Sequence, residues 1–545
     1  MPNLSQMKRK RMLEFLEKIK EEHKNDDEML IALGEIESEL NAKKYGLVWE
    51  EHEENVDVQM KTHIPVFTEV KEREISAAPD KPYNFLLEGD NLHSLYLLEK
   101  THKGSIDLIY IDPPYNTGNS FIYDDNLIGD EDSYKHSKWA SFIEKRLLLA
   151  KELLSPQGYI FISIDDKELS VMRLLCDSIF GESRFLTTIG WEKRTKCQNT
   201  KTARKMLQPR IEYILVYKNF DERAEFNCHT IGVKEYPLSD EKGQYRQEEI
   251  GQMGASGIRG RGSMIFDILG VMPKLGNQWK IGKETVGEFI ERGDLFVQEG
   301  KAYRKIRPYD ETQDNIKPFW ALFNANQYGT AESAKAELSN ILGTKEHEFE
   351  TVKPIQMIEE IIFQSTTTES VILDFFAGSA TTAQAVLEAN KDYGGDRRFI
   401  LCTNDESNIC SEIAYPRIKT VITGKRADDS AYSDGLPANL KYYRTDFVSR
   451  DEEFLSDALL EHITEMIQLE HGVKIDKSHY LMVMSDTEAD ELQKHFGEYN
   501  GVKALYVSKN VLLTTEQLKT FDGIEIHIIP DTYFKFELKE EGQAW

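Results

Sequence analysis

IYIDPPYNTG, residues 109–118, is the stretch around which the rest of this chain is organised. Residues 105–111 are rich in β-branched and aromatic side chains, and this pattern predicts a buried strand. The strand must end at Asp112, because Pro113 has no backbone donor for a central position in a sheet. Two consecutive prolines also fix φ and restrict the residue before each of them. Asp112 and Tyr115 are therefore expected on either side of a rigid step.

The chemistry of this loop favours one kind of ligand. A carboxylate, two proline carbonyls and an aromatic ring suit a flat ring that bears an amine. A nucleobase turned out of a duplex fits, because its exocyclic amine needs acceptors and its face needs a stacking partner. The same residues are also typical of an ordinary β-turn after a strand, since Asp and Pro are common turn formers. The loop alone leaves both interpretations open.

A second informative stretch is VILDFFAGSATTA, residues 371–383, which predicts a strand, a turn of small residues and the start of a helix. Asp374 ends the strand, and Gly378 lets the backbone come close to a ligand. Ser379 or a following threonine can cap the helix. Turns of this kind commonly cradle a cofactor in α/β proteins.

Together the two stretches resemble the catalytic and cofactor motifs of the S-adenosylmethionine-dependent amino-methyltransferases of DNA. The usual forms of these motifs are Asp/Asn/Ser-Pro-Pro-Tyr/Phe/Trp and Asp-x-Phe-x-Gly-Ser-Gly. Here the catalytic motif comes first, which resembles the permuted order of the β group of that family. More narrowly, residues 112–118 and the overall layout look like the modification subunit of type III restriction systems. The resemblance covers roughly residues 46–425.

The resemblance implies a doubly wound, Rossmann-like α/β sheet, S-adenosyl-L-methionine as cofactor and double-stranded DNA as substrate. It implies methyl transfer to N6 of a flipped adenine, with Asp112, Pro113, Pro114 and Tyr115 as the catalytic residues. Tyr115 stacks on the base, while Asp112 and the Pro113 carbonyl accept hydrogen bonds from its amine. No metal is required, because the methyl donor is already cationic. A restriction subunit with helicase and nuclease functions, and a second copy of this chain, are the implied partners.

Two other functions remain open. Methylation of N4 of cytosine uses the same geometry, although the family's cytosine enzymes more often carry Ser in place of Asp112. A different class of function is a non-catalytic subunit that only places a nuclease or helicase on DNA. The complete step from Asp112 to Tyr115 argues against the second alternative.

Seven residues are candidates for cofactor binding: Asp90, Lys353, Asp374, Phe376, Gly378, Ser379 and Glu406. By resemblance, Asp90 lies beside the adenine or ribose, although it is equally placed to cap the helix that follows it. Lys353 precedes Pro354 and, by resemblance, faces the cofactor's carboxylate, whereas a surface position is the alternative. Glu406 follows a predicted strand at 398–403 and is favoured as the ribose ligand because Asn404 occupies the strand end.

One residue of the cofactor motif departs from the family pattern. Ala380 stands where the family usually has glycine. If φ at this position is negative, alanine is tolerated at little cost; if φ is positive, the turn is strained.

The charge distribution points to one DNA-contacting segment. The net charge of −27 argues against nonspecific affinity for DNA, because phosphate contacts need clustered cations. Residues 193–210 nevertheless carry seven cations and no acidic residue: Lys193, Arg194, Lys196, Lys201, Arg204, Lys205 and Arg210. We expect this segment to grip phosphates, with a solvated basic loop as the alternative.

The periodicity of the chain divides it into five parts. We predict a helical arm at 1–45, the catalytic half of the sheet at 46–220, a target-recognition domain at 221–342, the cofactor half at 343–440 and a small α/β domain at 441–545. The interval 221–342 loses regular periodicity and gathers glycines with scattered arginines.

The composition of the 545 residues, 40% hydrophobic and 30% charged, is that of an ordinary soluble protein. No apolar run approaches the roughly 20 residues of a membrane span, and the first residues lack the apolar core of a signal peptide. A cytoplasmic location is expected. The five cysteines show no CxxC spacing, so neither a zinc site nor a disulfide framework is predicted.

Overall fold

The computed structural model of the chain describes residues 4–24, 27–41, 53–79, 81–116, 135–197, 205, 207–231, 234–256, 260–311, 316–345, 347, 349, 351–475, 479–499 and 501–542. The chain forms two compact units. One is Phe226–Trp320, and the other combines the residues before and after it.

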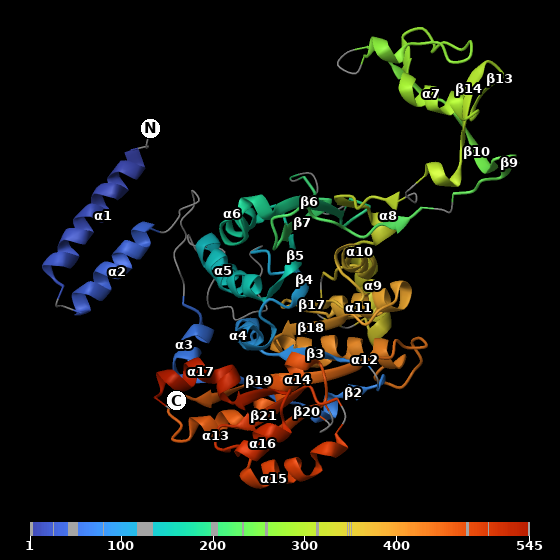
Figure 1. The fold of residues 1–545 in the computed structure, drawn as a ribbon. Helices are drawn as coiled ribbons and strands as arrows, with labels where there is room; N and C mark the ends of the chain where they lie inside the picture. The colour runs from blue at the N-terminus through green and yellow to red at the C-terminus, as the bar shows by residue number, and fades with distance from the viewer. Residues whose placement is uncertain are drawn as a thin grey trace. The chain divides into compact units, whose positions relative to one another are not determined.

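A large mixed sheet forms the centre of the larger unit (Figure 1). In spatial order its strands are β1 (His63–Glu69), β19 (Asn439–Ser449), β3 (Tyr83–Glu88), β18 (Arg398–Thr403), β17 (Val371–Asp374), β4 (Ile106–Ile111), β5 (Leu154–Ile164), β7 (Ile211–Lys218), β6 (Phe185–Glu192) and β16 (Leu322–Phe323), with β2 (Ile75–Ser76) paired to β19. Strands β19 through β5 are parallel, whereas β1 and β7 run antiparallel to their neighbours.

Two groups of helices cover the faces of this sheet (Figure 1). One group is α4 (Asn91–His102), α5 (Lys135–Leu153) and α6 (Leu169–Phe180), and the other is α9 (Ala331–Leu342), α10 (Ile355–Ser365), α11 (Thr381–Tyr393) and α12 (Tyr415–Thr423). Because both faces are covered, the central strands are apolar throughout: all residues of β3 and β17 are buried. The prediction of a doubly wound α/β fold is confirmed.

Strand pairing brings the two sequence motifs together. β17 pairs in parallel with β4, with Ile372 opposite Leu108 and Leu373 opposite Ile109. Asp112 and Asp374 therefore lie at neighbouring strand ends on the carboxyl edge of the sheet. β6 and β7 form an antiparallel pair, and β7 is antiparallel to β5. Lys193 and Arg210, the first and last residues of the segment between them, consequently lie at this same edge.

Helices and a small sheet flank the central fold. The arm comprises α1 (Leu4–Glu22) and α2 (Asp27–Asn41), followed by α3 (Asn55–Thr62). The C-terminal part comprises α13 (Leu455–Leu460), α14 (Ile463–His471), β20 (Tyr480–Val483), α15 (Asp486–His495), β21 (Ala504–Ser508), α16 (Thr515–Thr520), β22 (Glu525–Ile529) and α17 (Asp531–Glu540). Its three strands are parallel. Helices are found where the helical arm was predicted, and strands alternate with helices in the C-terminal part.

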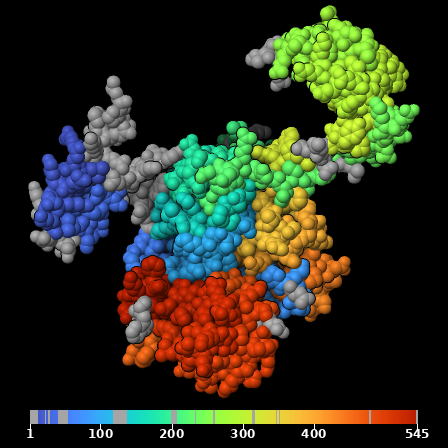
Figure 2. All heavy atoms as spheres, viewed as in Figure 1, coloured from blue at the N-terminus to red at the C-terminus, as the bar shows by residue number. Residues whose placement is uncertain are grey.

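The C-terminal part packs on the central fold. Figure 2 shows its surface, in red, directly beside the blue surface of the α4 region. Glu537 of α17 accepts hydrogen bonds from Lys100, at 2.5 Å, and from Tyr96 of α4. The boundary expected at 441 falls inside β19, which is a strand of the central sheet. None of the described helices is both long and apolar enough to cross a membrane.

The smaller unit is narrower than the predicted interval 221–342. It contains β8 (His229–Thr230), β9 (Leu238–Asp240), β10 (Gly243–Glu249), β11 (Gln252–Gly254), β12 (Asn277–Trp279), α7 (Lys283–Glu291), β13 (Leu295–Gln298), β14 (Lys301–Ile306) and β15 (Ile316–Lys317). β16, α8 (Ala325–Tyr328) and α9 belong instead to the larger unit. Its core is small, consisting of Ile250, Ile268, Trp279, Val286 and Ala302 with their partly buried neighbours.

A buried arginine compensates for the small core of this unit. Arg307 is 1% exposed and bonds Asp240 at 2.8 Å and the fully buried Asp294 at 2.6 Å. Removing one partner of a buried pair leaves an uncompensated charge and costs roughly 3–5 kcal/mol. We expect Arg307→Leu to unfold residues 226–320 selectively, seen as rapid cleavage there in limited proteolysis.

Arg304→Leu is the matched control, because the Arg304–Glu248 pair is partly exposed. Its cleavage pattern should follow that of the unmodified protein. Protection of residues 226–320 in the Arg307 variant would contradict the role given to this arginine.

Candidate active site

Asp112 lies at the centre of the site, immediately after β4. The Tyr115 hydroxyl donates to Asp112 Oδ1 at 2.5 Å. Lys353 Nζ donates to Asp112 Oδ2 at 2.7 Å and to the Tyr115 hydroxyl oxygen at 2.9 Å. Burial, followed by the Asp112 charge, raises the pKa of Tyr115 well above its ordinary value, so the hydroxyl stays neutral and donates. Both carboxylate oxygens of Asp112 are therefore engaged.

Lys353 belongs to a buried cluster of charges. It is 7% exposed and lies just before α10, with Nζ 3.5 Å from Glu212 Oε2. Lys193 Nζ donates to Glu212 Oε1 at 2.8 Å. Burial alone would lower the pKa of Lys353, but Asp112 and Glu212 raise it above its ordinary value. Burial acts to raise the pKa of Glu212, yet the two lysines bring it below its ordinary value. The cluster thus holds two cations and two anions.

The backbone of the catalytic loop is braced on both sides. The Pro114 carbonyl accepts from Trp139 Nε1 at 2.7 Å, so this carbonyl, one of the two expected as acceptors for a ligand, is already engaged. Asn116 has a φ of 54°, in the left-handed region. Its Nδ2 donates to Glu168 Oε1 at 2.7 Å, and Glu168 is fully buried. These contacts fix the loop immediately after Tyr115.

Asp374 braces the second turn from within. Its Oδ1 accepts from the Phe376 backbone N–H at 3.0 Å, and its Oδ2 accepts from the Thr382 hydroxyl at 2.5 Å. Gly378 has a φ of 48°, and a Cβ on it would lie 3.0 Å from the Phe349 ring. Only glycine fits this position without strain, as expected for a turn that a ligand approaches closely.

Arg417 of α12 holds the same turn from outside. It is 1% exposed, and Nη1 donates to the Ser379 carbonyl at 3.1 Å and to Thr381 Oγ1 at 2.7 Å. Its Nε donates to Gln384 Oε1 at 3.1 Å. Burial lowers the pKa of Arg417 to about 10, so the guanidinium stays charged at neutral pH. The sequence analysis missed this residue, because nothing local marks an arginine that folds back on a turn.

Asp90 caps α4, which is one of the two roles that the sequence analysis gave it. Its Oδ1 accepts from the Leu92 backbone N–H at 2.7 Å and lies 3.3 Å from Arg146 Nη2. Arg146 is fully buried, and its Nε donates to Asn91 Oδ1 at 2.5 Å. Asn91 Nδ2 in turn donates to the Phe375 carbonyl at 2.8 Å. Asp90 is thereby tied, through neighbours that the sequence analysis missed, to the turn after β17.

The other predicted residues have varied surroundings. Glu406 is exposed in a short 3-10 helix, Glu406–Asn408, beyond the end of β18. Lys193 faces Glu212, and Arg210 pairs with Glu192 at 3.2 Å. Lys196 and Lys205 are exposed and Arg194 is partly buried, whereas Lys201 and Arg204 lie outside the described residues. The structure thus joins Asp112, Tyr115 and Lys353 in one cluster beside the turn of Asp374, Phe376, Gly378 and Ser379.

Comparison with known proteins finds similarity to DNA methylases. Residues 106–402 match the model of the N6/N4 DNA methylase family. The chain is 30% identical over 424 residues to the Type III restriction-modification enzyme StyLTI Mod subunit of Salmonella typhimurium, covering 69% of this chain and 62% of that protein. It is 34% identical over 353 residues to the Type II methyltransferase M.KpnI of Klebsiella pneumoniae, covering 60% and 82%.

Two further proteins are also similar to this chain. The Type III restriction-modification enzyme EcoPI Mod subunit of Escherichia phage P1 is 32% identical over 379 residues, covering 59% of this chain and 58% of that protein. The chain therefore spans about three fifths of the length of these two Mod subunits, 62% and 58%. Among solved structures, PvuII DNA methyltransferase (cytosine-N4-specific) aligns with a TM-score of 0.34 at 12% identity, covering 62% of this chain and 88% of that one.

Ala380 has a positive φ, which is the strained alternative of the two that the sequence analysis gave. Its φ is 59°, in the left-handed region, where an L side chain costs roughly 1–2 kcal/mol. We expect Ala380→Gly to raise the free energy of unfolding by about 1 kcal/mol in urea titrations, because strain relief exceeds the added freedom of the unfolded chain. Ala383→Gly, inside α11, is the matched control and should destabilise by about 1 kcal/mol. Equal destabilisation by both variants would show that the turn is unstrained.

Asp374 predicts a pH dependence of stability. Burial raises its pKa to about 7, although hydrogen bonds from Thr382 and the Phe376 N–H act to lower it. An unfolded Asp ionises near about 3.9, so between these pH values the folded state binds a proton that the unfolded state lacks. Stability from this group therefore falls as pH rises towards 7 and is constant above it.

Asp374→Asn removes this dependence while keeping one acceptor and adding one donor. In thermal unfolding, we expect the midpoint temperature of the variant to rise relative to that of the wild type from pH 5.5 to 7. Above pH 7.5 the difference between the two midpoints should stay constant. Asp396→Asn, where the carboxylate is half exposed, is the control and is measured over the same pH range. A constant difference for Asp374→Asn across the whole range would rule out a titrating Asp374.

Proposed function

Because this chain belongs to the N6/N4 DNA methylase family, we propose that it is a site-specific DNA methyltransferase that methylates N6 of a flipped adenine with S-adenosylmethionine. The observation that carries the proposal is the pairing of β4 with β17. It sets the Asp112–Tyr115 step and the Gly378 turn on neighbouring strand ends, where open α/β sheets bind their ligands.

The turn after β17 fits the proposed cofactor. A Cβ on Gly378 would crowd the Phe349 ring in a left-handed turn, and Asp374 and Arg417 hold the turn without help from a ligand. Residues proposed to hold the cofactor are Asp90, Lys353, Asp374, Phe376, Gly378, Ser379 and Glu406. S-adenosylmethionine, when bound, supplies a methyl group that its sulfonium charge already activates. The chain's remaining task is to orient the base, and positioning of this kind accounts for large rate gains.

The catalytic loop is suited to hold the base. Tyr115 offers an aromatic face, and Asp112 offers carboxylate oxygens to the exocyclic amine. The Pro113 carbonyl is a further acceptor, since the described residues give it no hydrogen bond. Asp112 also stabilises the positive charge that develops on the attacking nitrogen. An aspartate in this position favours adenine over cytosine, so N6 methylation is proposed ahead of N4 methylation.

The topology supports an approach of DNA to this edge. The two ends of the segment 193–210 lie at the same edge of the sheet as Asp112, and the segment carries the proposed phosphate contacts, Lys193, Arg194, Lys196, Lys201, Arg204, Lys205 and Arg210. The unit Phe226–Trp320 is proposed to read the target sequence. A restriction subunit and a second copy of the chain are proposed as partners, and similarity to two Mod subunits of restriction-modification enzymes supports the first of these.

Asp112→Ala tests the proposed reaction. We expect it to lower transfer of labelled methyl groups to DNA by at least about a thousand-fold, because the amine loses its main acceptor. Affinity for S-adenosylmethionine, measured by calorimetry, should change less than about three-fold, because the described hydrogen bonds of the Asp112 side chain go to Tyr115 and Lys353 and not to the turn after β17. Asp166→Ala, an exposed carboxylate after β5, is the matched control and should retain activity.

Single-molecule sequencing of DNA from cells that express the chain identifies the modified base and its sequence context. Modified cytosine would replace N6 by N4 in the proposal. DNA without any modification, despite a folded protein, would favour the non-catalytic recognition subunit and reject the proposed activity.

A further inference from the structure

The Lys353 ammonium occupies the place that a substrate amine needs. A base amine must donate to Asp112, and Lys353 Nζ already donates to Asp112 Oδ2 at 2.7 Å. The other oxygen of Asp112 accepts from Tyr115. An ammonium and an exocyclic amine make the same kind of N–H bond to a carboxylate, so they compete for this acceptor. Asp112 has lone pairs left for a further donor, but a base amine that takes the place of Nζ on Oδ2 requires that Lys353 moves.

Glu212 offers Lys353 a second position. Glu212 Oε2 lies 3.5 Å from Lys353 Nζ and, in the described structure, accepts no hydrogen bond. Its other oxygen is held by Lys193 at 2.8 Å. A buried carboxylate oxygen without a donor is unfavourable, so the site gains when Nζ moves onto it. A shift of well under one bond length converts the 3.5 Å approach into a hydrogen bond.

We propose that Lys353 is a positioning residue that exchanges between Asp112 and Glu212 as the target base enters and leaves. The inference rests on the proposed function and adds a step to it. Without a base, Lys353 neutralises Asp112; when an amine arrives, Lys353 transfers to Glu212 and stays paired. Its flexible stem and compact charge suit such a move.

The exchange has a consequence for specificity. A base that lacks an exocyclic amine at this position cannot replace the donor that Lys353 withdraws. Asp112 would then keep only the bond from Tyr115, and its Oδ2 would be left without a donor, which is unfavourable for a partly buried carboxylate. Lys353 and Glu212 thus favour amine-bearing bases before any chemistry occurs.

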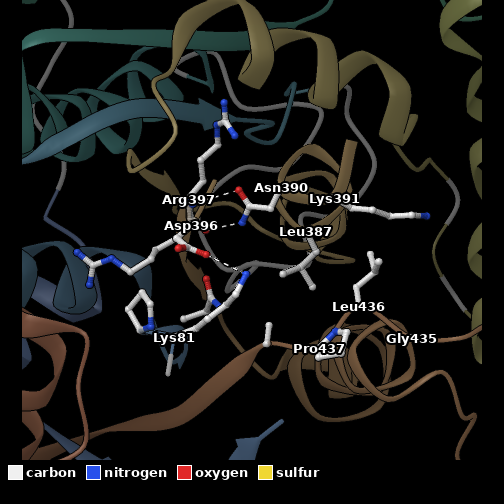
Figure 3. Close-up of a pocket in the computed structure, with 13 residues that line it drawn as sticks. Lys81, Leu387, Asn390, Lys391, Asp396, Arg397, Gly435, Leu436 and Pro437 are labelled. Carbon is white, nitrogen blue, oxygen red and sulfur yellow. Dashed lines mark hydrogen bonds and ion pairs between the residues drawn. The ribbon is translucent and has the colours of Figure 1, made fainter. Parts of the chain in front are cut away.

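A cavity elsewhere in the larger unit offers a control and not a competing site. It encloses about 310 Å³ at the amino edge of the sheet, between the starts of β3 and β18 (Figure 3). Lys81 pairs there with Asp396 at 2.9 Å, and Arg397 donates to Thr366 and to the Gly394 carbonyl. Lys81→Met therefore removes a lysine far from the catalytic edge.

The test measures entry of the base without cofactor. The probe is a duplex that carries the sequence methylated by the wild type, with fluorescent 2-aminopurine next to the target adenine. Its fluorescence rises when the target leaves the stack. We expect Glu212→Gln to lower the fraction of flipped base at least about five-fold, because Lys353 then stays on Asp112. Lys353→Met should match or exceed the wild type, and Lys81→Met should equal it.

The double variant Lys353→Met with Glu212→Gln decides the matter. If Glu212 acts through Lys353, the double variant flips the base as Lys353→Met does, so loss of the lysine rescues the loss of the glutamate. A double variant as weak as Glu212→Gln, or weaker, would overturn the inference. When purine replaces the target adenine in the same duplex, the wild type should flip a smaller fraction of the target base. In Lys353→Met the difference between the flipped fractions of adenine and purine should be smaller than in the wild type.

Failure of this inference is separable from failure of the proposed function. If the wild type transfers no methyl group to DNA, the proposed function is rejected and the exchange with it. If the wild type methylates DNA but the double variant shows no rescue, only the exchange is rejected. Thermal unfolding of each variant shows whether its fold is retained.

Discussion

The parallel pairing of β4 with β17 is the constraint on which the site depends. Each motif is built locally, one by two prolines after a strand and the other by a glycine turn before a helix. Neither local structure brings the other near. Their meeting follows from strand order, because parallel neighbours end at the same edge of a sheet. Lys353, which precedes α10, bonds Asp112 and lies 3.5 Å from Glu212, so it connects three segments that are distant in the sequence.

Charge balance is the second condition that shapes this edge. Lys193, Glu212, Lys353 and Asp112 are arranged so that each carboxylate faces a cation. Buried ions are tolerated only when they are paired and hydrogen-bonded. The cluster is complete except for Glu212 Oε2, which accepts no hydrogen bond in the described structure. A balanced set with one spare acceptor can change partners without leaving any buried charge alone.

The sequence predicted what depends on local pattern and missed what depends on long-range contacts. The end of β4 at Asp112 and the turn at Gly378 follow from prolines and glycine, and both could be located. The direction of Lys353 could not, because its partners lie on other strands. Lys193 looked like part of a free basic segment, yet it faces Glu212 across an antiparallel pair. Glu212 itself left a signal, as an acidic residue in the strand Ile211–Lys218 directly before residues 213–217, which are all apolar or aromatic.

The turn after β17 is held in a conformation that the chain would not adopt unaided. Ala380 is left-handed, Asp374 is buried with a raised pKa, and Arg417 is buried against the turn. Each feature is unfavourable in isolation, and strain of this kind persists only where the surroundings determine it. The hydrogen bonds of Asp374 and Arg417 hold the turn in this conformation. A turn that is already ordered loses little freedom when a ligand binds, so the strain is best explained as preorganisation for the proposed cofactor.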